Sequence, residues 1–219
     1  LYDSLICSDI IIYKDTLYTT GKQRGILYSS NNGTSWDVFN LGLDSISLTA
    51  SKMLRNENLF VLFVYGLNYN YFLSSTDGGR KWLSNVIPNS KLTDILLLDD
   101  KLIATTENGV KYSTDNGSTF KDLTGGELDS GMQSGRVFID EDKNIYIPTT
   151  KGLLQSTDNG KDWNIFITKE NMLNSNIWYT IVKNNVKVYG FNEEGDLFIT
   201  ENQGSDWQLI GDEISEYYA

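Results

Sequence analysis

The sequence lacks histidine altogether and has a single cysteine, Cys7. Without histidine, neither a Ser-His-Asp triad nor a Cys-His pair can form, and no metal site can use imidazole. One cysteine allows neither an intrachain disulfide nor a zinc cluster of thiolates, and we expect Cys7 to be a small core residue. Any catalysis would have to use carboxylates, Tyr, Lys, Arg or hydroxyl groups. We expect no metal and no cofactor.

Long apolar runs and an excess of positive charge are also missing. The longest apolar run, residues 59–65, has the length of a strand and falls short of the roughly 20 residues that span a bilayer, so we expect no membrane insertion. The formal net charge is −11. A field of this sign repels phosphate backbones, so nucleic acid is not expected as a partner. The sequence begins at Leu1 without a basic and apolar leader. A secreted or cell-surface location is expected, and the cytoplasm stays open.

One octet recurs five times, with Ser or Thr first, Asp or Asn third, Gly fifth and an aromatic residue eighth. Successive octet glycines are 38 to 46 residues apart, which is close to the period of a four-stranded propeller blade. The defining residues are Ser29, Asn31, Gly33 and Trp36; Ser75, Asp77, Gly79 and Trp82; Ser113, Asp115, Gly117 and Phe120; Ser156, Asp158, Gly160 and Trp163; and Thr200, Asn202, Gly204 and Trp207.

The octet has the composition of a tight turn between two strands. An Asp or Asn side chain can accept hydrogen bonds from backbone N–H groups ahead of it. Glycine two residues later can adopt a positive φ at little cost. The first hydroxyl can add a further bond, and the closing aromatic ring can pack back over the turn. We therefore expect a structural role for these residues.

Two apolar strands and a short third strand precede each octet, and a fourth strand follows it. Strands of about five residues between turn signals, with only two prolines, predict an all-β protein. We predict one domain, a five-bladed β-propeller of four-stranded antiparallel blades; five repeats of a larger ring are the alternative. The predicted blades are residues 1–41, 42–89, 90–124, 125–168 and 169–212, with 213–219 as a tail or closing segment.

The octets resemble the Asp-box, or bacterial neuraminidase repeat, of β-propeller proteins, with its Ser-x-Asp-x-Gly-x-x-Trp pattern. The resemblance covers nearly the whole chain, and the first and fifth copies depart from it by having Asn in place of Asp. It implies a structural turn on the blade periphery, away from the ligand. Proteins with this repeat include sialidases, xyloglucan-cleaving glycosidases, sorting receptors and a photosystem assembly factor, so the resemblance implies the fold far more than the function.

The resemblance does not extend to the catalytic residues of sialidases. Those enzymes use three arginines, a Tyr–Glu nucleophile pair, an Asp acid/base and an Arg-Ile-Pro motif. This sequence has four arginines, Arg24, Arg55, Arg80 and Arg136, and no Arg-Ile-Pro. Arg55 is predicted in a strand-connecting turn at the octet end, and Arg80 lies inside an octet. Neither is therefore placed to bind a substrate carboxylate on the opposite face, as the sialidase arginines do. We predict no sialidase activity and assign no catalytic residue.

The resemblance places ligands on the face opposite the octets, in loops between second and third strands and in links between blades. The loop 65–71 is rich in Tyr and Asn, and ring faces beside amides suit sugars and protein anchors alike. The alternative interpretation is that the loop is an aromatic-rich strand edge and that Trp178, which is predicted at the start of the inner strand of the last blade, packs in the core. The candidate ligand-binding residues are Tyr65, Asn68, Tyr69, Tyr71, Trp178, Arg24 and Arg136.

Three functions are compatible with this sequence. We expect a non-enzymatic binding or scaffolding module that recognises a protein or a carbohydrate. A glycoside hydrolase with two carboxylates is an alternative, although no pair stands out among 29 acidic residues. A purely structural domain of a larger surface protein is another. The oligomeric state is not predicted.

Overall fold

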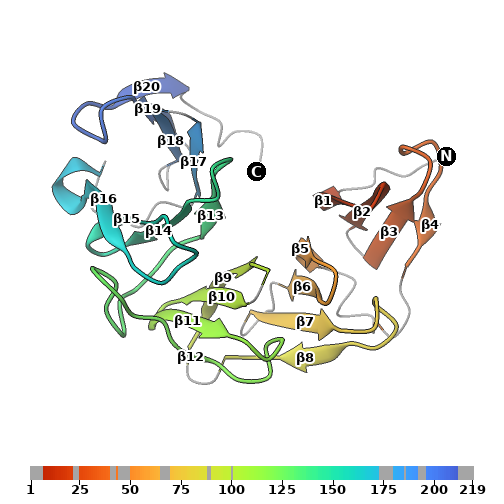
Figure 1. The fold of residues 1–219 in the computed structure, drawn as a ribbon. Coiled ribbons are helices and arrows are strands. Elements are labelled where there is room, and N and C mark those ends of the chain that lie inside the picture. The colour runs from red at the N-terminus through yellow and green to blue at the C-terminus, as the bar shows by residue number, and fades with distance from the viewer. Residues whose placement is uncertain are drawn as a thin grey trace. The chain divides into compact units, whose positions relative to one another are not determined.

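The computed structural model describes residues 7–21, 25–39, 43, 50–64, 70–87, 90–99, 101–172, 180–184, 186–191 and 196–211. In this part of the chain the secondary structure is all β apart from one 3-10 turn, η2 (Lys169–Asn171). The strands form five antiparallel sheets of four strands each, and in every sheet the strands lie in chain order (Figure 1). The predicted all-β class and its four-stranded antiparallel units are confirmed.

We number the sheets in chain order. Sheet 1 contains β1 (Cys7–Tyr13), β2 (Thr16–Gly21), β3 (Gly25–Ser29) and β4 (Asp37–Val38). Sheet 2 contains β5 (Ala50–Arg55), β6 (Phe60–Val64), β7 (Tyr71–Ser75) and β8 (Leu83–Asn85). Sheet 3 contains β9 (Leu92–Leu97), β10 (Leu102–Thr106), β11 (Gly109–Ser113) and β12 (Lys121–Asp122). Sheet 4 contains β13 (Phe138–Ile139), β14 (Ile145–Thr149), β15 (Gly152–Ser156) and β16 (Asn164–Thr168). Sheet 5 contains β17 (Thr180–Asn184), β18 (Lys187–Phe191), β19 (Leu197–Thr200) and β20 (Gln208–Gly211).

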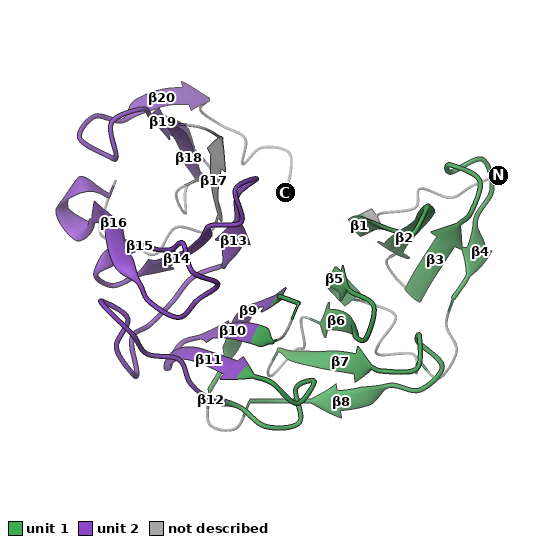
Figure 2. Cartoon of the chain, viewed as in Figure 1, with its two compact units in different colours: residues 1–92, 97–102, 113–120 green, residues 93–96, 103–112, 121–219 purple. Residues whose placement is uncertain are grey.

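The chain divides into two compact units (Figure 2). Unit 1 comprises residues 1–92, 97–102 and 113–120, and unit 2 comprises residues 93–96, 103–112 and 121–219. Unit 1 therefore contains sheets 1 and 2 with two turns of sheet 3, whereas unit 2 contains sheets 4 and 5 with the rest of sheet 3.

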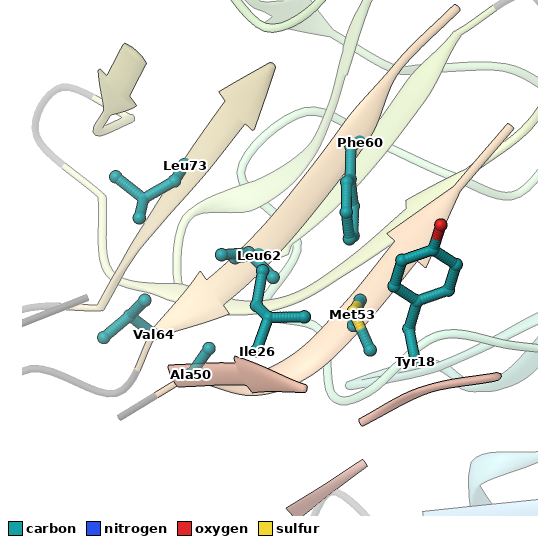
Figure 3. Packing of buried hydrophobic residues seen from close by; sticks show 8 residues of the cluster. All are labelled: Tyr18, Ile26, Ala50, Met53, Phe60, Leu62, Val64 and Leu73. Carbon is teal, nitrogen blue, oxygen red and sulfur yellow. The ribbon is translucent and has the colours of Figure 1, made fainter. Parts of the chain in front are cut away.

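The core of unit 1 lies between sheets 1 and 2 (Figure 3). Tyr18 and Ile26 of sheet 1 pack against Met53, Phe60 and Leu62 of sheet 2. All five residues of β6 are buried, because alternate side chains of this strand enter the packing on both faces of the sheet. That explains the continuous apolar run at residues 59–65, which a strand with one solvated face would not show.

An arginine is enclosed by aromatic rings at the edge of this core. The Arg55 guanidinium lies 4.4 Å from the ring centroid of Tyr13, 4.9 Å from that of Tyr18 and 4.8 Å from that of Phe60. One of its terminal nitrogens, Nη1, is buried without a hydrogen-bond partner, so the rings are its main neighbours. The prediction that Arg55 belongs to a turn is corrected: it is the last residue of β5, held by packing between sheets 1 and 2.

The core of unit 2 includes side chains of sheets 4 and 5. Tyr146, Leu153 and Ile167 of sheet 4 cluster with Val188 of sheet 5. The rings of Phe138 and Tyr146 are stacked, with their centroids 4.8 Å apart. Sheet 4 thus contributes buried side chains of β14, β15 and β16 to this core, and sheet 5 contributes Val188 of β18.

Candidate functional site

Each octet begins on the last residue of a third strand, at Ser29, Ser75, Ser113, Ser156 and Thr200. The turns after β1, β5, β9, β13 and β17 lie at the same end of their sheets as the octets, because the strands of each sheet alternate in direction. The loops between second and third strands lie at the other end. The candidate residues therefore fall into an octet end and an opposite end of each sheet.

The third octet shows how the turn is held. The Ser113 hydroxyl donates to Asp115 Oδ1 at 2.7 Å and accepts from the Gly117 N–H at 2.9 Å. Thr119 donates to the same carboxylate twice, from its hydroxyl to Oδ2 at 2.6 Å and from its N–H to Oδ1 at 2.9 Å. These bonds, the Thr119 hydroxyl first, lower the pKa of Asp115 to about 2. Asn116 and Gly117 complete the turn with φ of +60° and +88°.

The other octets repeat this pattern. In every copy the N–H of the fifth-position glycine donates to the first hydroxyl, at 2.8 to 3.0 Å. Asn31 and Asn202 accept from the seventh-position N–H just as the aspartates do, at 3.0 and 2.9 Å. Backbone N–H groups, of Lys81 and of Asp162 first, lower the pKa values of Asp77 and Asp158. The turn thus uses the carboxylates for its own hydrogen bonds.

The octet tryptophans differ in their surroundings. Trp163 is completely buried and its Nε1 has no hydrogen-bond partner, whereas 38% of Trp36 is exposed. Trp82 donates from Nε1 to the Gly79 carbonyl within its own octet, at 3.0 Å. Trp207 instead donates to the carbonyl of Asn171, at 2.7 Å.

Most of the predicted ligand-binding residues lie outside the described residues: Arg24, Tyr65, Asn68, Tyr69 and Trp178. Tyr71 is the first residue of β7, half-buried, and packs against the core of unit 1. Beside it, the Asn70 side chain donates to the Leu92 carbonyl at 2.7 Å. Arg136 is exposed, belongs to unit 2 and precedes β13 by two residues rather than opening it.

Two turns at the opposite end follow a pattern that the sequence analysis missed. In sheet 3, the Thr106 hydroxyl donates to the Gly109 carbonyl at 2.6 Å and accepts from the Asn108 N–H at 3.1 Å. Thr149 does the same in sheet 4, with the Gly152 carbonyl at 3.0 Å. The signal was a shared Thr-x-x-Gly. These two-residue turns are closed on themselves, so the longer loops between second and third strands are those of sheets 1, 2 and 5, at residues 22–24, 65–70 and 192–196. The links between sheets start and finish at this end as well.

A small polar pocket lies at the octet end within unit 1. It is lined by the turn after β5, the turn after β9 and the start of the third octet, and includes Asn58, Asp99 and Lys101. The Asn56 side chain, which also lines it, joins two of these turns: Oδ1 accepts from two backbone N–H groups of its own turn at 2.8 and 2.9 Å, and Nδ2 donates to the Leu98 carbonyl at 3.4 Å. Among the described residues, Asp99 is the one carboxylate that lines this pocket, so they supply no pair of the kind that a glycosidase requires.

The buried carboxylate of Asp140, in the turn after β13, has a structural role as well. Asp140 accepts hydrogen bonds from the N–H groups of Asp142 and Asn144, at 3.0 and 2.9 Å, and from the Tyr146 hydroxyl at 3.0 Å. Burial, and then the bond to Asp140, raise the pKa of Tyr146. Across the described ranges, no three Cys, Asp or Glu side chains gather as a metal site would require. No helix in those ranges is long and apolar enough to span a membrane.

No protein-family model matches the sequence, and no curated protein is similar to it in sequence. Solved structures do resemble the fold. YCF48 from Cyanidioschyzon merolae superposes with a TM-score of 0.62 and 16% identity, over 95% of this chain and 73% of that one. A structure of YCF48 bound to D1 peptide superposes with a TM-score of 0.58 and 13% identity, over 93% of this chain and 66% of that one. The fold is of the β-propeller type.

Two larger proteins contain a similar arrangement. The GH74 xyloglucanase from Xanthomonas campestris gives a TM-score of 0.60 and 14% identity, over 94% of this chain and 38% of the enzyme. The extracellular domain of BT4673 from B. thetaiotaomicron gives a TM-score of 0.63 and 16% identity, over 94% of this chain and 28% of that one. The chain therefore spans well under half of either protein, and at these identities the likeness concerns the fold alone.

Proposed function

We propose that this protein is a non-enzymatic binding module, a five-bladed propeller with an Asp-box turn in each blade, which recognises a protein or glycan through the end opposite the octets. The observation that carries the proposal is the contrast between the two ends. The octets use their carboxylates, hydroxyls and glycine N–H groups within their own turns. What remains for a ligand are the loops at residues 22–24, 65–70 and 192–196 and the links between sheets, such as residues 169–179, which include Trp178.

The composition of these loops favours recognition by contact over catalysis. The loop of sheet 2 combines Tyr65 and Tyr69 with Asn68, and Tyr71 follows it as the first residue of β7. Such side chains provide flat apolar area together with amide donors and acceptors. The net charge of −11 favours a partner that carries basic residues. The structure of YCF48 bound to D1 peptide supports a peptide segment as ligand, and the extracellular domain of BT4673 supports a location outside the cell.

The test is binding of the purified protein to a peptide array and a glycan array. We expect selective binding that Tyr69→Ala and Trp178→Ala weaken at least about tenfold, because aromatic anchors dominate small interfaces. Trp36→Ala is the matched control, since it removes an exposed aromatic residue at the octet end. Tyr71 packs on the core, so Tyr71→Ala is interpreted only if its thermal unfolding matches that of the parent protein. Absence of binding to either array, or equal weakening by Trp36→Ala, would contradict the proposal.

Glycoside hydrolysis is the second candidate, and the similarity to a GH74 xyloglucanase favours it. Hydrolysis needs two carboxylates about 5–10 Å apart. The octet aspartates and Asp140 are bound within their own turns. We expect no release of reducing ends from xyloglucan; release at a rate proportional to enzyme concentration would replace the binding proposal with an enzymatic one.

A further inference from the structure

Three of the four Asn–Gly pairs in the sequence occupy the same two places, the fourth and fifth, in three octets: Asn32–Gly33, Asn116–Gly117 and Asn159–Gly160. The three asparagines are exposed and have positive φ, of +56°, +60° and +63°. Glycine has no side chain to hinder its backbone nitrogen, so that nitrogen can reach the preceding carboxamide more easily than in any other dipeptide. The octets therefore bring together the groups that react when an asparagine deamidates.

The nucleophile of this reaction is the glycine nitrogen, and the octet hydroxyl already holds that nitrogen in a hydrogen bond. The N–H groups of Gly33, Gly117 and Gly160 each donate to the first-position serine at 2.9 Å. Gly117 and Gly160 are buried, and Gly33 is only half-buried. A glycine nitrogen that is bound in this way is neither accessible to a base in solvent nor free to turn toward the preceding side chain.

We propose that these Asn–Gly pairs are sites of spontaneous deamidation, which the octet serine prevents while the turn is folded. In the reaction the glycine nitrogen forms a bond to the asparagine Cγ, the Cγ–Nδ2 bond breaks, and ammonia leaves with the proton of the glycine N–H. Water then adds to one of the two carbonyls of the resulting cyclic imide and opens it. The product is aspartate or isoaspartate, and water is the only co-reactant.

The modification is irreversible for the turn. Isoaspartate inserts one extra carbon into the main chain between the fourth and fifth positions, so the glycine N–H can no longer meet the serine hydroxyl in the same geometry. Each event also replaces a neutral amide with a carboxylate. Conversion of all three sites would change the formal net charge from −11 to −14, one unit for each site. Each slow opening of the turn that leads to deamidation therefore changes the charge and the backbone permanently.

The degree of burial predicts an order among the sites. Deamidation in the folded protein proceeds at the rate of the open turn multiplied by the fraction of turns that are open. Gly33 is the least buried of the three glycines, so Asn32 should react first, ahead of Asn116 and Asn159. In urea the three sites lose this protection together and should react at similar rates.

The experiment is peptide mapping by mass spectrometry of the protein aged at neutral pH, which measures aspartate and isoaspartate at each site. We expect Ser113→Ala to accelerate deamidation at Asn116 about tenfold, which corresponds to about 1.4 kcal/mol for the lost hydrogen bond. Asn159, in another octet, should be unaffected. Ser113→Thr retains a hydroxyl, as Thr200 does in the fifth octet, and should keep Asn116 slow, which separates loss of the bond from loss of the fold.

The second octet supplies the matched control. It has Gly78–Gly79 in place of an Asn–Gly pair, so Ser75→Ala opens a turn that contains no side-chain amide to deamidate and should leave Asn116 unchanged. Asn116→Gly, which copies the residue of the second octet, should abolish the signal at that site. The proposal is overturned if the folded protein deamidates as fast as the protein in urea, or if Ser113→Ala has no effect at Asn116.

Discussion

At the scale of single residues, the octets show that Asp and Asn are equivalent in geometry and different in charge. Asn31 and Asp115 hold the same turn and accept the seventh-position N–H at 3.0 and 2.9 Å. The carboxylate gains an additional strong bond, because the Thr119 hydroxyl donates to its second oxygen. In the first octet, the Asn31 side chain instead donates to the Ser35 hydroxyl. The difference between the two residues should therefore appear as a dependence on pH.

We predict that Asp115→Asn removes part of the acid sensitivity of the protein. The pKa of Asp115 is about 2 in the folded state, below an unfolded value of about 3.9. A lowered folded pKa means that the carboxylate stabilises the fold above the unfolded value and that this contribution is lost as the pH falls toward 2. Thermal unfolding between pH 5 and pH 2.5 should show a smaller fall in Tm for the variant than for the parent protein.

The reciprocal change provides the control. Asn31→Asp places a carboxylate in the first octet, where the Ser35 hydroxyl can rotate to donate to it as Thr119 does to Asp115. This variant should show a steeper fall in Tm over the same pH range. Parallel curves for the two variants and the parent protein would contradict the assigned role of the carboxylate.

At the scale of elements, the octet turn also forms part of the packing between sheets. A Cβ added to Gly117 would lie 2.7 Å from a ring atom of Phe72 in sheet 2. The ring of Phe120 lies edge-on to the same Phe72, with centroids 5.8 Å apart. The turn of the third octet is thus fitted against the neighbouring sheet within unit 1, and its glycine is needed for space as well as for its positive φ.

We predict that Gly117→Ala is far more destabilising than Gly78→Ala. Both glycines have positive φ, +88° and +75°, and alanine in that region costs about 1–2 kcal/mol. Only Gly117 has a neighbour within 4 Å, and overpacking adds about 1–3 kcal/mol. Equilibrium unfolding in urea should give a larger loss for Gly117→Ala by roughly that additional amount. Equal losses would mean that the Phe72 ring moves aside without cost.

At the scale of the whole molecule, the charge balance matters more than any single ion pair. Most of the described salt bridges, such as that between Lys14 and Glu57 at 3.3 Å, join exposed side chains and contribute little; the pair of Lys111 with Asp122 is more buried. With 29 acidic and 18 basic residues, the folded chain repels itself, and this repulsion is weakened by salt.

We predict that NaCl stabilises the protein at neutral pH. Raising the concentration from about 10 mM to about 150 mM shortens the Debye length from about 30 Å to about 8 Å. The Tm should rise accordingly, and KCl at the same ionic strength should have the same effect, because the effect is one of screening. A fall in Tm, or a rise with only one of the two salts, would contradict this account.

The parts of the structure that the sequence predicted are those with short-range causes. The octet turns depend on hydrogen bonds that reach at most four residues, such as that from Gly33 to Ser29. The strands were predicted from the alternation and length of their apolar runs. They were therefore predictable from local residue types, and the four-stranded antiparallel sheets confirm them. The Thr-x-x-Gly turns are equally local, but they were not predicted because the pattern was found in two of the repeats rather than in all five.

The candidate site was less predictable, because exposure and orientation depend on distant residues. Tyr71 was predicted from the composition of its loop, whereas the structure packs it against the core of unit 1. Arg136 was predicted to open a strand and instead precedes β13. The ligand roles of these residues remain predictions.

By itself the sequence determined the five repeats, the four-stranded antiparallel units and the chemistry of the turns, because all of these follow from neighbours along the chain. Only the tertiary structure decided that Trp163 is completely buried while Trp36 is exposed, although both occupy the same octet position. It also decided that Arg55 lies among three aromatic rings, and that Asp9 accepts the Met53 N–H across 44 positions of sequence. These contacts join residues from different sheets, and their formation depends on how the sheets pack rather than on any local pattern.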